Sequence, residues 1–179
     1  MFFEPMGVVT PTIYLAHGAS GSAASMRPHV KGLEARGLRA VAVQLQRGGP
    51  AERAVPRYRE QVRREPGEAV IGGHSFGGRV ASLLAAEEQL AGLVLLSFPL
   101  HRPGRPETAE TRTAHFGAIR CPVLLLSGES DPFARLEPLR DVVKRLPNAE
   151  LVTYPGVGHG LKPVLDDALD RIAAFVRDL

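Results

Sequence analysis

Six short apolar runs alternate with stretches of helical periodicity, and this alternation limits the folds that the chain can adopt. Strands are predicted at 12–16, 40–45, 69–73, 93–98, 123–127 and 151–154, and helices at about 23–36, 51–65, 77–90, 133–146 and 163–178. Strands that are apolar along nearly their whole length are buried on both faces, which parallel sheets achieve by carrying helices on each side. The sequence therefore predicts an α/β fold with a mostly parallel, doubly wound sheet of about six to seven strands.

Length and composition are those of one globular domain covering residues 1–179. The 179 residues are 44% hydrophobic and 23% charged, which is ordinary for a soluble protein. No apolar run reaches the roughly 18 residues that a membrane-spanning helix needs, and the first residues lack the basic segment of a signal peptide. The single cysteine, Cys121, excludes an internal disulfide and suits a reducing compartment. We expect a cytoplasmic protein without a membrane partner.

Basic side chains concentrate in one stretch, although the net charge is only +3. The stretch contains Arg53, Arg57, Arg59, Arg63 and Arg64, with Glu52, Glu60 and Glu65 between them. Alternating charges of this kind are typical of a solvated helix face. No recognised nucleic-acid-binding motif accompanies them, so we expect no nucleic-acid partner.

The segment 69–78 ends an apolar run in Gly73-His-Ser75-Phe-Gly77, which has the form G-x-S-x-G. In that motif a serine occupies a tight, strained turn between a strand and a helix, so its neighbours two positions away must be small. A predicted strand precedes this copy and a helical pattern follows it. These features predict that Ser75 is a catalytic nucleophile.

A serine hydroxyl needs an imidazole to accept its proton and a carboxylate to orient that imidazole. Asp131 follows the predicted strand 123–127, and His159 stands between two glycines after the strand 151–154. Parallel strands would bring both to the sheet edge that carries Ser75. Glu129 is a rival acid, since its two-residue offset could place it on the same strand face.

Backbone amides must also stabilise the oxyanion that develops during acyl transfer. One predicted donor is the amide of Phe76, directly after the nucleophile. The segment His17-Gly-Ala19-Ser20-Gly21 follows the first strand and resembles an HG oxyanion loop, which makes Ala19 the second donor. Ser20 is a weaker rival nucleophile, because small residues also flank it.

Other chemistries have little support in the sequence. The six histidines show no metal-ligand spacing, and the glycine-rich segments lack the lysine of a phosphate-binding loop. We therefore expect neither a metal nor a cofactor.

Four segments together resemble the α/β-hydrolase superfamily: HGASG at 17–21, GHSFGG at 73–78, SGESDPF at 127–133 and GVGHG at 156–160. The resemblance implies that Ser75 attacks an acyl group, that His159 acts as base and then acid, and that Asp131 orients His159. The compact form without a lid domain is similar to dienelactone-hydrolase-like proteins, although true dienelactone hydrolases have a cysteine nucleophile where this chain has Ser75. Compared with a full hydrolase, the first strands are truncated to residues 1–9 or absent.

The expected function is a serine hydrolase that cleaves a carboxylic ester or thioester of a small-molecule acyl substrate. The alternative is a non-catalytic binding or scaffold protein that keeps the fold, because segment 97–107 also resembles a branch that includes subunits of a histone-acetyltransferase complex. The proline-rich segment 99–115 is expected to be a loop where relatives carry a lid. By position, the candidates for substrate contact are Leu100, His101, Phe133 and Leu161, although an exposed loop histidine is the simpler interpretation of His101.

Overall fold

A computed structural model describes residues 9–62 and 68–179, and its centre is a single parallel sheet. The strands of this sheet run in the order β2-β1-β3-β4-β5-β6. They are β1 (Thr12–Ala16), β2 (Ala40–Val43), β3 (Ala69–His74), β4 (Gly92–Leu96), β5 (Val123–Gly128) and β6 (Ala149–Tyr154). Every adjacent pair is parallel, so all six carboxyl ends meet at one edge.

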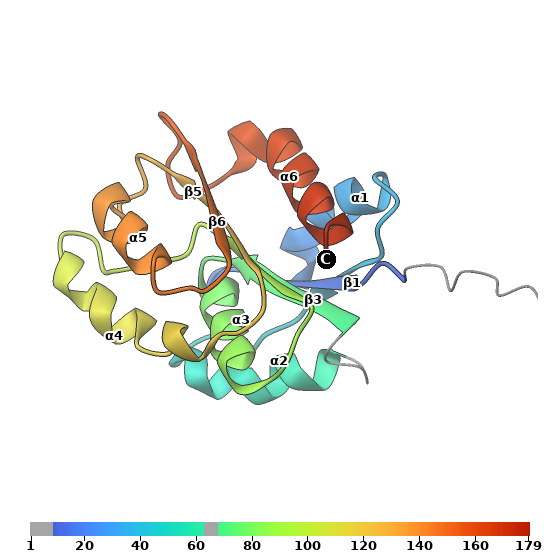
Figure 1. The fold of residues 1–179 in the computed structure, drawn as a ribbon, viewed down its shortest axis with the longest axis horizontal. Helices are drawn as coiled ribbons and strands as arrows, with labels where there is room; N and C mark the ends of the chain where they lie inside the picture. Colours follow the sequence, from blue (N-terminus) through green and yellow to red (C-terminus); the bar gives the residue numbers. More distant parts are fainter. Residues whose placement is uncertain (1–8, 63–67) are drawn as a thin grey trace, which may run out of the picture.

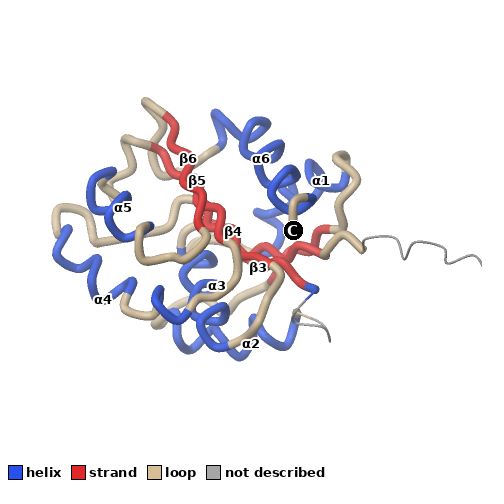
Figure 2. The backbone as a smooth tube through the Cα atoms, in the orientation of Figure 1, coloured by secondary structure: helices blue, strands red, loops and turns tan. Residues whose placement is uncertain are grey.

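Helices cover both faces of the sheet (Figures 1 and 2). On one face lie α1 (Arg27–Glu34) and α6 (Leu165–Arg177), which bury Leu33 and Ile172 against the strands. The other face carries α2 (Val55–Gln61), α3 (Phe76–Glu87), α4 (Ala109–Thr113) and α5 (Leu136–Val143). Two separate hydrophobic cores result, one on each side of the sheet. The expected α/β-hydrolase architecture is confirmed, with every strand pair parallel.

The predicted strands all form, and the helices differ mainly at their ends. The pattern at 23–36 begins with a 3-10 turn at Ala23–Met26 before α1, and the pattern at 51–65 begins with one at Ala51–Ala54 before α2. Pro28 and Pro56 stand at the starts of the α-helices, where proline is tolerated because no intrahelical N–H is needed. Residues 63–67 of the second pattern lie outside the described residues, as do residues 1–8, so the expectation for the first strands is not addressed there.

The segment 99–115 is not the plain loop that its three prolines indicate. It contains a 3-10 turn at Pro106–Thr108 followed by α4. The Thr113 hydroxyl donates to Ala109 O at 2.8 Å, and the Arg112 guanidinium donates to Pro99 O at 2.7 Å. A helix of five residues is too short to show a sequence period, and side-chain bonds to the backbone hold it in place.

The strand order reverses direction between β1 and β3, because β2 lies on one side of β1 and all later strands lie on the other. Open α/β sheets place their ligands at such a switch point, outside the carboxyl ends of the strands. The segments after β1 and β3 are those that contain Ala19 and Ser75.

Among the described residues, none of the helices has the length and apolar composition of a membrane-spanning segment.

Candidate active site

Ser75 occupies a strained turn between β3 and α3. Its φ of 51° and ψ of −115° are rare for a residue with a side chain. The Ser75 amide donates to Leu96 O on the neighbouring β4 at 2.8 Å, which ties the turn to the sheet. Gly73 has no room for a side chain, since a Cβ there would lie 2.5 Å from Ala16 O. These contacts hold the serine hydroxyl at the carboxyl edge.

Three of the predicted site residues lie in a hydrogen-bonded row. His159 Nε2 is 2.8 Å from Ser75 Oγ, and His159 Nδ1 is 2.8 Å from Asp131 Oδ2. Because a carboxylate only accepts, Nδ1 carries the ring proton and Nε2 presents a lone pair to the serine hydroxyl. The second Asp131 oxygen accepts the Phe133 amide at 2.8 Å. The row can move a proton from the serine to the imidazole.

Burial distinguishes Asp131 from its rival Glu129. The Asp131 side chain is fully buried, whereas that of His159 is 26% exposed. Glu129 is exposed and accepts the Thr153 hydroxyl at 2.8 Å, on β6. The two-residue offset does not bring Glu129 to His159, because β5 ends at Gly128 and the chain then turns.

The two predicted oxyanion amides lie on neighbouring segments. Phe76 is the first residue of α3, where the helix itself offers an amide no acceptor. Ala19 is exposed in the turn that the Gly21 amide closes on Gly18 O at 3.0 Å. His17 anchors this turn: it is 1% exposed, its Nδ1 donates to Gly18 O at 2.7 Å, and its Nε2 accepts the Leu45 amide at 3.0 Å. The rival Ser20 lies in the same turn.

The candidates for substrate contact separate into two groups. Leu100 and His101 are fully buried, so the expectation of an exposed loop histidine is wrong. His101 Nδ1 donates to Arg102 O at 2.8 Å, and its Nε2 accepts the Arg135 amide at 2.9 Å. The Nε2 bond joins the segment after β4 to the segment before α5, and Leu100 belongs to the hydrophobic core. These two residues support the fold around the site.

Phe133 and Leu161, the other two candidates, lie near the hydrogen-bonded row. The Phe133 ring packs on the imidazole of His159 with centroids 4.5 Å apart. Leu161 follows His159 by two positions and lines a cavity on the α1–α6 side of the sheet. The cavity therefore lies on the face opposite to the segment 99–115.

His74 lies near the site, and the sequence indicates it only as part of the G-x-S-x-G motif. Its Nε2 donates to His159 O at 3.2 Å, and the two rings lie 5.4 Å apart. Burial lowers the pKa of His74, and the adjacent His159 ring lowers it further, whereas the bond to His159 O opposes the shift. An uncharged imidazole therefore joins the serine turn to the His159 loop. The signal in the sequence was its place next to Ser75.

Ser97 is a second residue whose structural role the sequence does not indicate. It has a φ of 49°, is fully buried, and its hydroxyl has no hydrogen-bond partner among the described residues. Its amide donates to Leu126 O at 2.8 Å, so the strain lies where β4 leaves the sheet. No side-chain pattern in the sequence indicates this conformation.

Within residues 9–62 and 68–179, no group of three His, Cys, Asp or Glu side chains is placed to hold a metal ion. The thiol of Cys121 is buried, and burial raises its pKa to about 11. This thiol is therefore protonated at neutral pH and is not a nucleophile of the site.

Solved structures share this fold at low sequence identity. A monoacylglycerol lipase from Paleococcus ferrophilus is 16% identical with a TM-score of 0.78, over 93% of this chain and 95% of that chain. Est1E from Butyrivibrio proteoclasticus, solved with ferulic acid bound, is 19% identical with a TM-score of 0.74, over 94% and 88%. A predicted CIB-like hydrolase from Thermoplasma acidophilum is 16% identical with a TM-score of 0.78, over 98% and 90%.

No curated protein matches the sequence. A family model described as an alpha/beta hydrolase domain matches residues 9–174, a span that includes all six strands and the hydrogen-bonded row. The chain therefore belongs to the α/β-hydrolase family and is a hydrolase.

Proposed function

We propose that this hydrolase cleaves a carboxylic ester or thioester through an acyl-enzyme on Ser75. The observation that carries the proposal is the row from Ser75 Oγ through His159 to the buried Asp131, with two hydrogen bonds of 2.8 Å. A serine becomes nucleophilic when an oriented imidazole takes its proton. The lipase and esterase neighbours share the fold with this chain.

The proposed reaction has two halves. Ser75 Oγ attacks the carbonyl carbon while its proton passes to His159 Nε2, and the amides of Ala19 and Phe76 donate to the oxyanion. When the tetrahedral intermediate collapses, His159 gives that proton to the leaving alcohol or thiol. Water then attacks the acyl-serine with His159 as base, which releases a carboxylic acid and restores the serine. Asp131 holds Nδ1–H throughout and so fixes the tautomer.

A fluorophosphonate probe tests the nucleophile. The native protein should gain one covalent adduct that peptide mass spectrometry maps to Ser75. Ser75→Ala should lose the adduct, and Ser20→Ala, which removes the rival hydroxyl, should keep it. Unchanged labelling of Ser75→Ala would refute the proposal. A scaffold protein with the same fold would take up no label and would cleave no acyl ester.

Two matched substitutions of a carboxylate by an amide test which acid orients His159. Asp131→Asn should lower kcat for a p-nitrophenyl ester by about 10³–10⁴-fold, since the wrong tautomer of His159 then faces the serine. Glu129→Gln should stay within about twofold of the native protein, because Glu129 contacts Thr153 instead. Thermal unfolding of both variants checks that they fold. Equal losses in the two variants would contradict the assignment of the acid.

A further inference from the structure

A cavity of about 410 Å³ lies between α1, α6 and the carboxyl ends of β1, β3 and β4. Its wall is largely apolar, and Met26, Leu96, Leu161 and Leu165 form much of it. A dry cavity of about 150 Å³ is enough to hold a benzene ring. This one therefore has room for an apolar group of six carbons or more.

The cavity adjoins three segments of the candidate active site. Gly18 precedes Ala19, His74 precedes Ser75, and Gly160 follows His159, and all three of these neighbours line the cavity. Consecutive Cα atoms are only about 3.8 Å apart. Sequence neighbours of the site residues thus border the cavity, and His74, whose imidazole donates to His159 O, is one of them.

The lining favours uncharged ligands. Burial, together with the nearby His74 ring, lowers the pKa of His29 to about 4, and burial lowers that of His74. Both imidazoles are therefore neutral at pH 7. Lys162 is the charged residue of the lining, and it is exposed. An ionised group inside would lose its hydration without gaining a buried partner.

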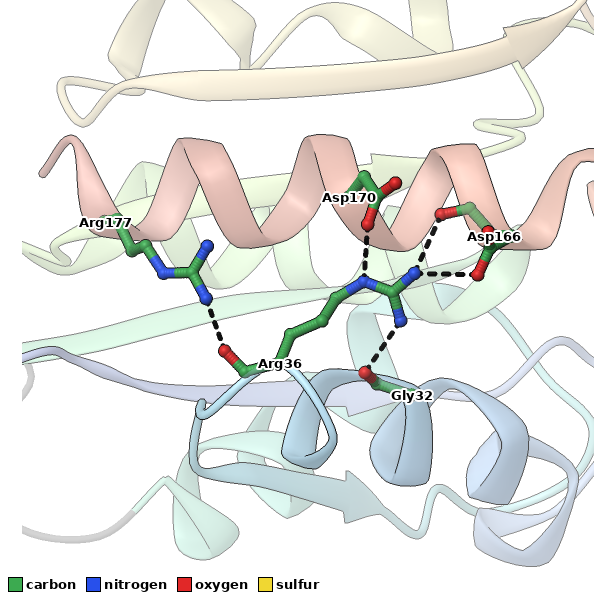
Figure 3. Close-up of polar contacts among 5 residues, drawn as sticks. All are labelled: Gly32, Arg36, Asp166, Asp170 and Arg177. Carbon is green, nitrogen blue, oxygen red and sulfur yellow. Dashed lines mark hydrogen bonds and ion pairs between the residues drawn. The ribbon is translucent and has the colours of Figure 1, made fainter.

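The two helices that frame the cavity are fixed to each other (Figure 3). The Arg36 guanidinium bonds to Asp170 Oδ1 at 2.7 Å and Asp166 Oδ1 at 2.8 Å on α6, and to Gly32 O on α1 at 2.9 Å. Arg177 donates to Arg36 O from the far end of α6. A Cβ at Gly32 would lie 2.3 Å from Leu169 Cδ1, so the helices approach closely. These contacts set the spacing of α1 and α6 beside the cavity.

We propose that this cavity binds an uncharged apolar group of the substrate, either the acyl chain or the alcohol part, of roughly six carbons. The inference rests on the proposed ester or thioester hydrolysis and adds the class of group that the site selects. No residue of the segment 99–115 lines this cavity.

Two ester series separate the two parts of the substrate. In the first, the acyl chain of a p-nitrophenyl ester grows from two to eight carbons; in the second, acetate esters carry alkyl alcohols of the same lengths. Burying one methylene is worth about fourfold in kcat/KM. We expect a rise of at least tenfold from two to six carbons in one series. A flat profile in both series would overturn the inference.

A bulky residue in the cavity should remove this preference. Leu165 begins α6 and lines the cavity, whereas Leu136 begins α5 and lies outside it. Leu165→Trp should lower the ratio of kcat/KM for the six-carbon ester to kcat/KM for the acetyl ester at least tenfold. Leu136→Trp should leave the ratio of the two esters unchanged. Leu165→Phe, a milder change, should shift the ratio in the same direction, and equal ratios in all variants would contradict the cavity's role.

A binding measurement keeps this inference separate from catalysis. In Ser75→Ala protein, methyl hexanoate should raise Tm because it binds the folded state, and Leu165→Trp in the same background should abolish the rise. If fluorophosphonate labels Ser75 but neither chain length nor methyl hexanoate has an effect, the cavity inference alone fails. If methyl hexanoate binds but Ser75 takes no label, the proposed hydrolysis fails and the cavity stands.

Discussion

Gly77 is the residue at which one added methyl group should disturb both the fold and the site. A Cβ there would lie 2.5 Å from Ala16 O and 2.7 Å from His17 O, where ordinary contacts begin near 3.4 Å. The groups must therefore separate by about 0.9 Å (3.4 minus 2.5). The atoms in the way are backbone atoms at the end of β1, which cannot rotate aside.

Two effects oppose each other in Gly77→Ala. Alanine is favoured over glycine in a helix by up to about 1 kcal/mol, but overpacking of this kind costs about 1–3 kcal/mol or more. Because the contact is with backbone, we expect overpacking to dominate, with a net loss of about 2 kcal/mol. For a protein of this size that lowers Tm by roughly 4–8 °C. The shift also moves the turn that carries Ala19, and a displacement near 1 Å can cost about 10²-fold in rate.

The assay compares thermal unfolding and ester kcat/KM with Gly117→Ala as the control. A Cβ at Gly117 meets nothing within 4 Å, so this variant should change stability by less than about 0.5 kcal/mol. If Gly77→Ala matched Gly117→Ala in both measurements, the reasoning from close packing would be refuted. A lower Tm with unchanged kcat/KM would refute only the link to the Ala19 turn.

Two further predictions concern stability. The fully buried Tyr58 hydroxyl lies 2.6 Å from Gly72 O and accepts the Gly72 amide at 3.0 Å. Tyr58→Phe should therefore lower the free energy of unfolding, measured in urea, by about 1–3 kcal/mol. An unchanged unfolding midpoint would contradict this. The pKa of His29 is lowered to about 4 in the folded state, so the unfolded chain binds the proton first as pH falls below 6.5. The stability that His29 contributes is thus complete above pH 6.5, and about 1–3 kcal/mol of it is lost between pH 6.5 and 4. The free energy of unfolding of His29→Gln should depend less steeply on pH in that window. Parallel curves of this free energy against pH for the variant and the native protein would exclude the effect.

Much of the site could be predicted because its reactive side chains come after the ends of strands. Ser75, Asp131 and His159 each come within five residues of the end of a strand, and parallel strands gather those ends at one edge whatever the details of packing. The choice between Asp131 and Glu129 could not be made from spacing. It depends on where β5 stops, and the turn after Gly128 carries Glu129 towards Thr153.

The surroundings of the site were harder to predict. His101 stands among prolines and arginines, yet tertiary contacts bury it, because the amide of Arg135, 34 positions later, needs an acceptor. Leu100 likewise looks like a cleft residue by position but packs in the core. The cavity at Leu161 depends on how closely α1 approaches α6. Because these helices come from opposite ends of the chain, no local sequence pattern indicates the distance between them.

The pairing of α1 with α6 also bears on how the protein is made. The face of the sheet that α1 begins to cover stays open until α6 arrives, and the bond between Ser75 and His159 joins residues 84 positions apart. During synthesis, all six strands emerge from the ribosome before α6, with that apolar face exposed, a state prone to aggregation. Chaperones that bind apolar segments should therefore hold the nascent chain until Leu165–Arg177 has been translated. The core between the sheet, α1 and α6 would thus be completed only after the segment that contains His159 has been made.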